Sequence, residues 1–162
     1  MSIHGRTREQ KYKGFADWEY IKGCKEVAGD DILVFGNGDL FTPEKALEEL
    51  KNSGADGILI SRGGMGAPWI AENVKRLDRG EKLIEVTPEL IKTTFLQHMD
   101  YIASYQGERK AVLSMRRVGC WYLKEYPLAK KLRLALNKAP TMSEIRSLIE
   151  TFEWDQDSVA MA

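Results

Sequence analysis

The pattern of apolar and polar positions divides the chain into a first part of alternating strands and helices and a second part made of helices. Short apolar runs over residues 32–35 and 57–61 predict buried strands, each followed by a glycine-containing loop and a helical pattern. Residues 2–3 read as the end of one more strand. We therefore expect three strand–loop–helix units, a period typical of a (β/α) barrel or a doubly wound sheet.

Capping residues mark the helices of this first part. Asp17 can cap a helix that ends at Gly29, and Thr42 can cap one that begins at Pro43. Pro68 is expected to open a third helix that reaches about residue 77. A charged linker over residues 78–86 follows.

From Thr87 onward the strand signal disappears, and apolar residues recur at helical spacing. The pattern predicts helices over about residues 88–106, 108–126, 127–136 and 142–152, the last opened by a capping box at Thr141. We expect an array of βα units over residues 1–80, a four-helix bundle over 81–153 and a frayed acidic tail over 154–162.

Composition limits the class of protein. Of the 162 residues 43% are hydrophobic and 30% are charged, as in a soluble globular protein. No apolar run approaches the ~20 residues of a membrane span, and the N-terminus lacks a secretory apolar segment, so a cytoplasmic location is expected. Cys24 and Cys120 are too few and too far apart for a disulfide framework or a zinc cluster, and no metal site is predicted.

The formal net charge is zero, but the charges are unevenly placed. Residues 107–138 hold nine basic residues against two acidic ones. The basic residues are Arg109, Lys110, Arg116, Arg117, Lys124, Lys130, Lys131, Arg133 and Lys138. Such a segment indicates a surface that faces a polyanion, with a solvated helix face as the alternative.

Three polar loops follow the three strands, at residues 4–8, 37–39 and 61–64. Right-handed crossovers bring the carboxyl ends of parallel strands to one edge of a sheet, so these loops should meet. Backbone N–H groups at Gly38 and Gly63 could hold a phosphate, and Arg62 could add a cation.

The same loops limit which ligand would fit. Asn37 could hydrogen-bond the edge of a ring, whereas Asp39 is an acceptor that should bond donors in the loops or a ligand's N–H. No G-x-G-x-x-G motif follows any strand, so a coenzyme with one phosphate and a polar ring fits better than a dinucleotide.

Several short motifs also occur along the chain in the order found in a known protein family. They are HGRTREQ (4–10), GFADW (14–18), GNGD (36–39), GADG (54–57), RG (62–63), PW (68–69), MRR (115–117), WYLK (121–124) and KLR (131–133). Together the motifs resemble the C-terminal half of a tRNA-dihydrouridine synthase of the bacterial B type, to about residue 152.

The resemblance implies an α/β plus all-α fold, namely the last three βα units of an FMN-binding (β/α)8 TIM barrel followed by a helical tRNA-binding domain. The implied activity is reduction of uridine in tRNA to 5,6-dihydrouridine, with FMN as cofactor and NADPH as reductant. The implied cofactor-binding residues are His4, Asn37, Gly38, Asp39, Ser61 and Arg62. The implied tRNA contacts are Arg6, Arg8, Arg116, Arg117, Lys124, Lys131 and Arg133. For Arg6 and Arg8, pairing with acids such as Glu9 and Asp39 is the alternative.

The sequence departs from the family pattern at two positions, with Ser61 where glycine is common and Val118 where histidine is frequent. The family's acid cysteine and flavin-side lysine belong to its N-terminal half, so no catalytic residue is expected in this chain. Cys24 and Cys120 are interpreted as core thiols.

The same resemblance predicts a polypeptide that is inactive alone. Its outer strands would need a missing N-terminal barrel half, or self-association through open strand edges. The alternatives are an RNA-binding helical module with a remnant barrel, and another FMN barrel oxidoreductase that acts on a small molecule.

Overall fold

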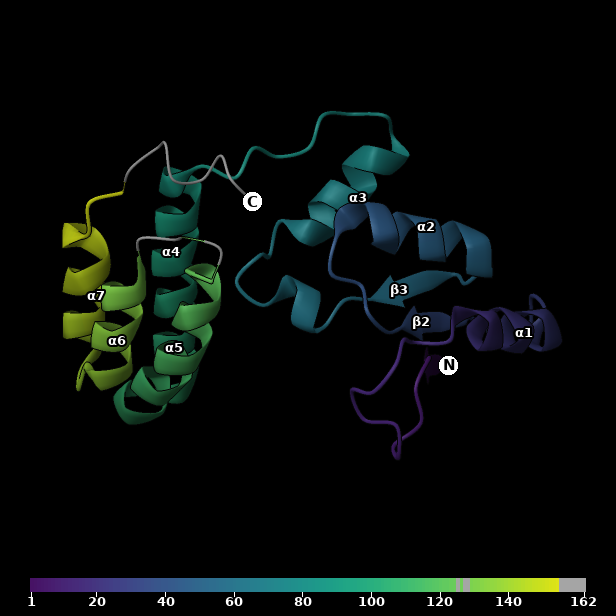
Figure 1. Ribbon diagram of the computed structural model, residues 1–162, viewed down its shortest axis with the longest axis horizontal. Helices are drawn as coiled ribbons and strands as arrows, with labels where there is room; N and C mark the ends of the chain where they lie inside the picture. The colour runs from purple at the N-terminus through teal and green to yellow at the C-terminus, as the bar shows by residue number, and fades with distance from the viewer. Residues whose placement is uncertain (125, 127–128, 155–162) are drawn as a thin grey trace. The chain divides into compact units, whose positions relative to one another are not determined.

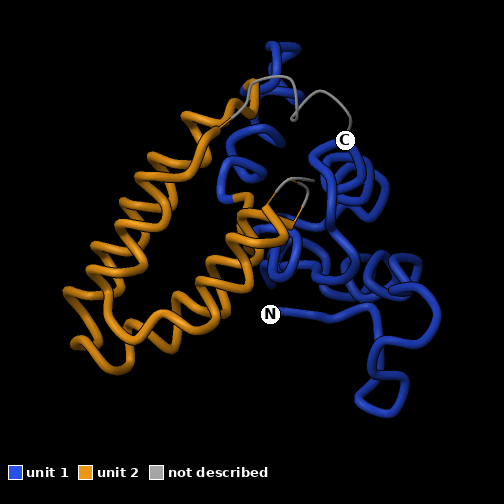
Figure 2. Tube along the Cα trace, turned by 60° about the vertical axis from the view of Figure 1, so that its left-hand side comes forward, with its two compact units in different colours: residues 1–64, 68–84 blue, residues 65–67, 85–162 orange. Residues whose placement is uncertain are grey.

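The computed structural model describes residues 1–124, 126 and 129–154, and these form two compact units. Unit 1 comprises residues 1–64 and 68–84, and unit 2 comprises residues 65–67 and those from 85 onward, as Figure 2 shows. The two units are described separately below.

Unit 1 is built on three short parallel strands, β1 (Ser2–His4), β2 (Phe35–Asn37) and β3 (Gly57–Leu59), in the spatial order β1-β2-β3. Ile3 lies opposite Gly36, and Gly36 lies opposite Ile58. The predicted α/β class is therefore confirmed. All three strands point the same way, so their carboxyl ends lie at one edge of the sheet.

The predicted bounds of two strands were wrong. The apolar run 32–35 enters the sheet only at its last residue, because the Asp56 carboxylate accepts the N–H of Val34 at 2.8 Å and the Asp56 N–H donates to the Val34 carbonyl. Ile32 and Leu33 are exposed. The run thus leads into β2 instead of forming it, and β3 ends two residues before the predicted Ser61.

Three helices connect and cover the strands: α1 (Trp18–Ala28), α2 (Pro43–Ser53) and α3 (Ile70–Asp78), with α2 packed against both α1 and α3 (Figure 1). The Asp17 and Thr42 side chains accept N–H groups of the first turns of α1 and α2, as predicted. The main cluster of buried apolar residues in the unit comprises Trp18, Ile21, Val34, Leu40, Ala46, Ala55 and Val74.

The segment after α3 is held to that helix by a buried amide. Asn73 is 4% exposed, and its side-chain oxygen accepts the N–H of Ile84 at 2.8 Å. Arg79 pairs with Glu81 and Glu72 on the surface. The linker that was predicted over residues 78–86 is therefore anchored to unit 1 almost to its end.

Unit 2 contains α4 (Pro88–Gln106), α5 (Glu108–Tyr122), α6 (Lys130–Lys138) and α7 (Met142–Thr151). α5 packs on the other three helices, and α7 also packs on α4 and α6. The Thr141 side chain accepts the N–H of Glu144 at the start of α7, as the capping motif predicts. Large buried side chains of the shared core include Phe95, Met115, Leu136, Ile145 and Ile149.

The second helix of this unit ends four residues earlier than predicted. Residues 127 and 128, the predicted start of the next helix, and residues 155–162 of the predicted frayed tail lie outside the described residues. Trp154 is described, and its ring N–H donates to the Ile149 carbonyl at 3.0 Å. In the described part of the chain, no helix is both long and apolar enough to span a bilayer.

Candidate functional site

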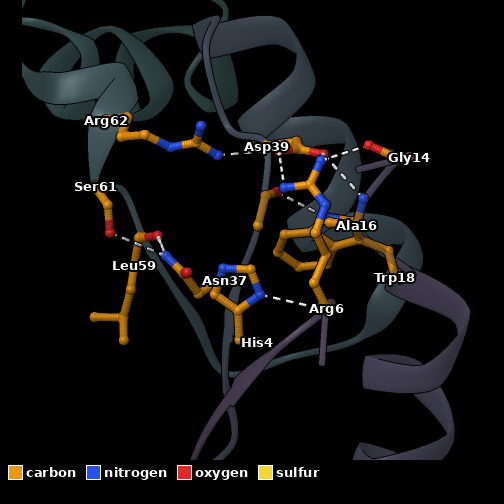
Figure 3. Close-up of polar contacts among 11 residues, drawn as sticks. His4, Arg6, Gly14, Ala16, Trp18, Asn37, Asp39, Leu59, Ser61 and Arg62 are labelled. Carbon is orange, nitrogen blue, oxygen red and sulfur yellow. Dashed lines mark hydrogen bonds and ion pairs between the residues drawn. The ribbon is translucent and has the colours of Figure 1, made fainter. Parts of the chain in front are cut away.

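The loops after β1, β2 and β3 meet in a pocket of about 240 Å³ in unit 1. All six residues that the sequence proposes for cofactor binding line this pocket: His4, Asn37, Gly38, Asp39, Ser61 and Arg62. Figure 3 shows most of them pointing toward one another from the three strand ends. The structure therefore brings the predicted set together.

Asn37 ties the second loop to the third. Its side-chain NH2 group donates to the Leu59 carbonyl and, at 3.3 Å, to the Ser61 hydroxyl (Figure 3). Both contacts use the amide nitrogen, so the amide oxygen is the group of Asn37 that can accept a hydrogen bond from a ligand.

A bidentate ion pair joins the first loop to the second. Arg6 donates to the two carboxylate oxygens of Asp39 at 2.7 and 2.6 Å, and also to the Gly14 carbonyl at 2.7 Å. Asp39 further accepts the N–H of Ala16 at 2.9 Å. The side chains of Arg6 and Asp39 are only 6% and 19% exposed.

This ion pair is the pairing that the sequence offered as the alternative to a tRNA contact for Arg6. Its terminal nitrogens donate three hydrogen bonds to Asp39 and Gly14, and a tRNA contact of Arg6 stays a prediction. Asp39 bonds donors in the loops, as its acceptor-only chemistry predicts. Both residues therefore shape the pocket.

Arg62 is a cation of the pocket that is partly exposed and only weakly paired. Its side chain is 38% exposed, and its contact with Asp39 Oδ1 is long, at 3.5 Å. The carbon of its guanidinium lies 4.5 Å from the Tyr12 ring centroid and 5.2 Å from that of Phe41. Ring contacts use no N–H groups, so most of the five donors can serve an anion.

His4 adds a donor of a different kind. Its Nδ1 accepts the backbone N–H of Arg6 at 2.9 Å, so the neutral ring carries its proton on Nε2. Nε2–H can then donate to a ligand in the pocket that His4 lines.

Two glycines allow the loops to approach this closely. A Cβ at Gly63 would lie 1.9 Å from the Leu40 carbonyl oxygen, and one at Gly38, where φ is +143°, would lie 2.5 Å from the Ala16 Cβ. No side chain larger than hydrogen fits at either position without moving backbone. The pocket therefore depends on glycine at both positions.

Besides Leu40 and Leu59, sequence reasoning missed three pocket residues with charged or aromatic side chains, Lys11, Tyr12 and Phe41. Tyr12 and Phe41 are large aromatic side chains in polar loops, 75% and 52% exposed. An aromatic residue beside a predicted ligand loop was the signal that could have identified them.

The predicted tRNA contacts outside the pocket fall into two groups. Arg116 donates to the Ala139 carbonyl at 3.0 and 2.8 Å, and Arg133 donates to the Leu123 carbonyl at 2.6 Å, so both hold backbone within unit 2. The exposed members are Arg8, Arg117, Lys124 and Lys131.

The cysteines take no part in the pocket lining. The Cys120 thiol donates to the Arg116 carbonyl at 3.2 Å, and burial raises the pKa of the thiol. Cys24 lies half-buried on α1. Within the described ranges, no group of three or more His, Cys, Asp or Glu residues could hold a metal ion.

Comparisons with known proteins give matches over most of the chain. Residues 1–156 match the family model described as Dihydrouridine synthase (Dus). The chain is 34% identical over 142 residues to the tRNA-dihydrouridine synthase B of Xanthomonas axonopodis, covering 87% of this chain and 42% of that protein. It is 38% identical over 138 residues to a probable tRNA-dihydrouridine synthase of Rickettsia bellii, covering 85% and 42%.

A third relative, the tRNA-dihydrouridine synthase B of Shewanella oneidensis, is 33% identical over 153 residues, covering 94% of this chain and 47% of that protein. The chain thus spans less than half the length of these curated relatives. The matched region includes every strand and helix described above. By this match, the chain belongs to the dihydrouridine synthase family.

Proposed function

We propose that this chain forms the phosphate end of an FMN site and a tRNA-binding helical unit of a tRNA-dihydrouridine synthase. The observation that carries the proposal is the convergence of three strand-end loops on one pocket with Arg62 at its rim. When bound, FMN would supply the electron pair that reduces uridine to 5,6-dihydrouridine, with NADPH as the source. The residues of this chain would bind the flavin and orient it.

The pocket fits part of a mononucleotide. Its volume of about 240 Å³ is slightly below the ~300–1,000 Å³ of complete ligand pockets. Arg62 would pair with the phosphate, with the Ser61 hydroxyl beside it. The Asn37 amide oxygen and the Nε2–H of His4 would contact the polar remainder of the ligand. Gly38 allows its close approach, and Asp39 holds the loops in place.

The three strands of unit 1 would be neighbouring strands of a TIM barrel. Within the described residues, β1 and β3 each pair with a strand on one side only. Further βα units of the barrel, a partner chain or a second copy of this chain would pair with these edges. Residues 1–80 would then be the barrel part, and residues 81–153 a four-helix tRNA-binding domain of a cytoplasmic enzyme.

Arg62→Ala is expected to raise the dissociation constant for FMN by about tenfold, because a charge-assisted hydrogen bond contributes about 1.5 kcal/mol or more. The affinity for riboflavin, which lacks the phosphate, should not change. Fluorescence titration of the full chain with both flavins measures the two constants.

Arg79→Ala is the matched control, because Arg79 is a surface arginine of unit 1 that does not line the pocket. It should leave both constants unchanged. The proposal would be wrong if Arg62→Ala weakened the binding of FMN and of riboflavin equally. It would also be wrong if the chain bound neither flavin at millimolar concentration.

Substitution of two adjacent arginines of α5 should distinguish a residue that binds tRNA from a residue that stabilises the fold. Arg117 is exposed, whereas Arg116 donates to the Ala139 carbonyl. Arg117→Ala should weaken tRNA binding and reduce the slope of log affinity against log salt by about 1, because one phosphate contact is lost. Arg116→Ala should instead lower the free energy of unfolding by about 2 kcal/mol.

Filter binding at several salt concentrations and denaturant unfolding of both variants test this pair. Each arginine serves as the control for the other. A tRNA affinity that does not fall as salt rises would count against the basic helices as the tRNA contact.

A second candidate function is RNA binding without flavin chemistry. It is favoured by the compact core that unit 2 has of its own. Binding of tRNA at micromolar concentration by a chain that binds no flavin would support it.

A further inference from the structure

The pocket contains two aromatic side chains that hydrophobic burial does not explain. The side chains of Tyr12 and Phe41 are 75% and 52% exposed, although aromatic rings usually lose most of their surface on folding. Both rings lie against the same guanidinium, that of Arg62. Their common feature is therefore this cation.

The three residues come from three different loops. Tyr12 follows β1, Phe41 follows β2 and Arg62 follows β3. The guanidinium carbon lies 4.5 Å from one ring centroid and 5.2 Å from the other, within the ~6 Å range of cation–π attraction. Arg62 is thus the point at which the three loops make contact around one charge.

The backbone places Tyr12 for this contact. Lys13 donates its N–H to the Gln10 carbonyl at 2.9 Å, which closes a tight turn with Tyr12 near its tip. Lys11, inside that turn, has φ +50°, a left-handed conformation that a lysine adopts at a cost of about 1–2 kcal/mol. Thr7 and Gln10 exchange two hydrogen bonds that brace the loop.

The polar contacts of Arg62 would not hold its side chain alone. Its bond to Asp39 is 3.5 Å long, and Asp39 already makes the short bidentate pair with Arg6. A long arginine side chain that is 38% exposed loses rotamer entropy when an anion binds it. Rings that fix the guanidinium beforehand reduce this loss and leave its N–H donors available.

We propose that Tyr12 and Phe41 are positioning residues that hold the Arg62 guanidinium ready for the phosphate of a flavin mononucleotide. This inference rests on the proposed phosphate-binding role of Arg62. It adds the loop after β1 to the phosphate site, through a ring that does not itself bind the phosphate.

The first test needs no ligand. Protons beside the guanidinium of Arg62 should be shifted upfield by the two rings in the NMR spectrum of the full chain. Tyr12→Leu and Phe41→Leu should each reduce that shift, and Tyr12→Phe should keep it because a phenyl ring stacks as well. Tyr20→Leu is the control, since Tyr20 is an exposed tyrosine of α1 outside the pocket.

The second test uses FMN and riboflavin as probes. Tyr12→Leu and Phe41→Leu should each raise the FMN dissociation constant by about twofold to fivefold, the range of exposed cation–π contacts. Riboflavin affinity should stay constant, and Tyr12→Phe should restore FMN affinity. If the two rings had only a structural role, these variants would lose affinity for FMN and for riboflavin equally.

The outcomes separate the two proposals. Absence of the upfield shift at Arg62, or equal loss of FMN and riboflavin affinity in Tyr12→Leu, would overturn the positioning role. A wild-type chain that shows the ring-dependent shift but binds neither flavin would overturn the FMN proposal and leave the contact of the rings with Arg62 standing.

Discussion

Asp39→Asn is expected to lower the free energy of unfolding of unit 1 by about 3 kcal/mol, because it leaves the buried Arg6 guanidinium without a countercharge. The change is nearly isosteric. Asparagine also tolerates the left-handed backbone of this position, where φ is +51°, so the loss should come from the charge rather than from strain. Hydrogen exchange of the β1 and β2 amides reports on unit 1 separately from unit 2.

Asp31→Asn is the matched control, because Asp31 is exposed in the loop before β2, and it should change stability by less than about 0.5 kcal/mol. Arg6→Met combined with Asp39→Asn should recover part of the loss, since no charge is then left unpaired. An Asp39→Asn variant as stable as the wild type would show that the ion pair does not hold the loops together.

Gly63→Ala is expected to have the largest effect on the pocket. The new Cβ would lie 1.9 Å from the Leu40 carbonyl oxygen, so the loop after β3 must move away from the loop after β2. Overpacking of this kind costs about 3 kcal/mol at the upper end of its usual range. We expect FMN affinity to fall by at least about tenfold, because Arg62 moves with Gly63. Flavin titration and hydrogen exchange measure the two effects.

Gly64→Ala controls for the loss of a glycine in the same turn. Its Cβ would meet the Ile60 and Ile70 methyl groups at 3.8 and 3.9 Å, which is ordinary contact. This variant should bind FMN as the wild type does. If both variants behaved alike, the close approach at Gly63 would not be what forms the pocket.

Local chemistry made much of the fold predictable from the sequence. Asp17, Thr42 and Thr141 each accept a backbone N–H at the start of a helix, where the sequence placed a cap. The three parallel strands followed from two apolar runs and a strand end at residues 2–3, each before a loop that contains glycine. The start of β2 was not predictable, because the Asp56 side chain, 22 residues away, binds the N–H of Val34.

The candidate site was predicted as a set of residues but not as a set of contacts. The loops were placed at one edge because parallel strands share their carboxyl ends. Whether Arg6 would face tRNA or pair with Asp39 depended on a burial that no local pattern encodes. The same holds for Arg116 and Arg133, whose partners are carbonyls of other segments of unit 2.

Backbone chemical-shift mapping of the full chain during an FMN titration tests the central claim most directly. We predict saturable shifts in three segments that are far apart in sequence, residues 4–6, 37–41 and 61–63, with smaller shifts at residues 61–63 when riboflavin replaces FMN. Shifts in only one of these segments, or shifts confined to unit 2, would contradict a flavin site made from three strand ends.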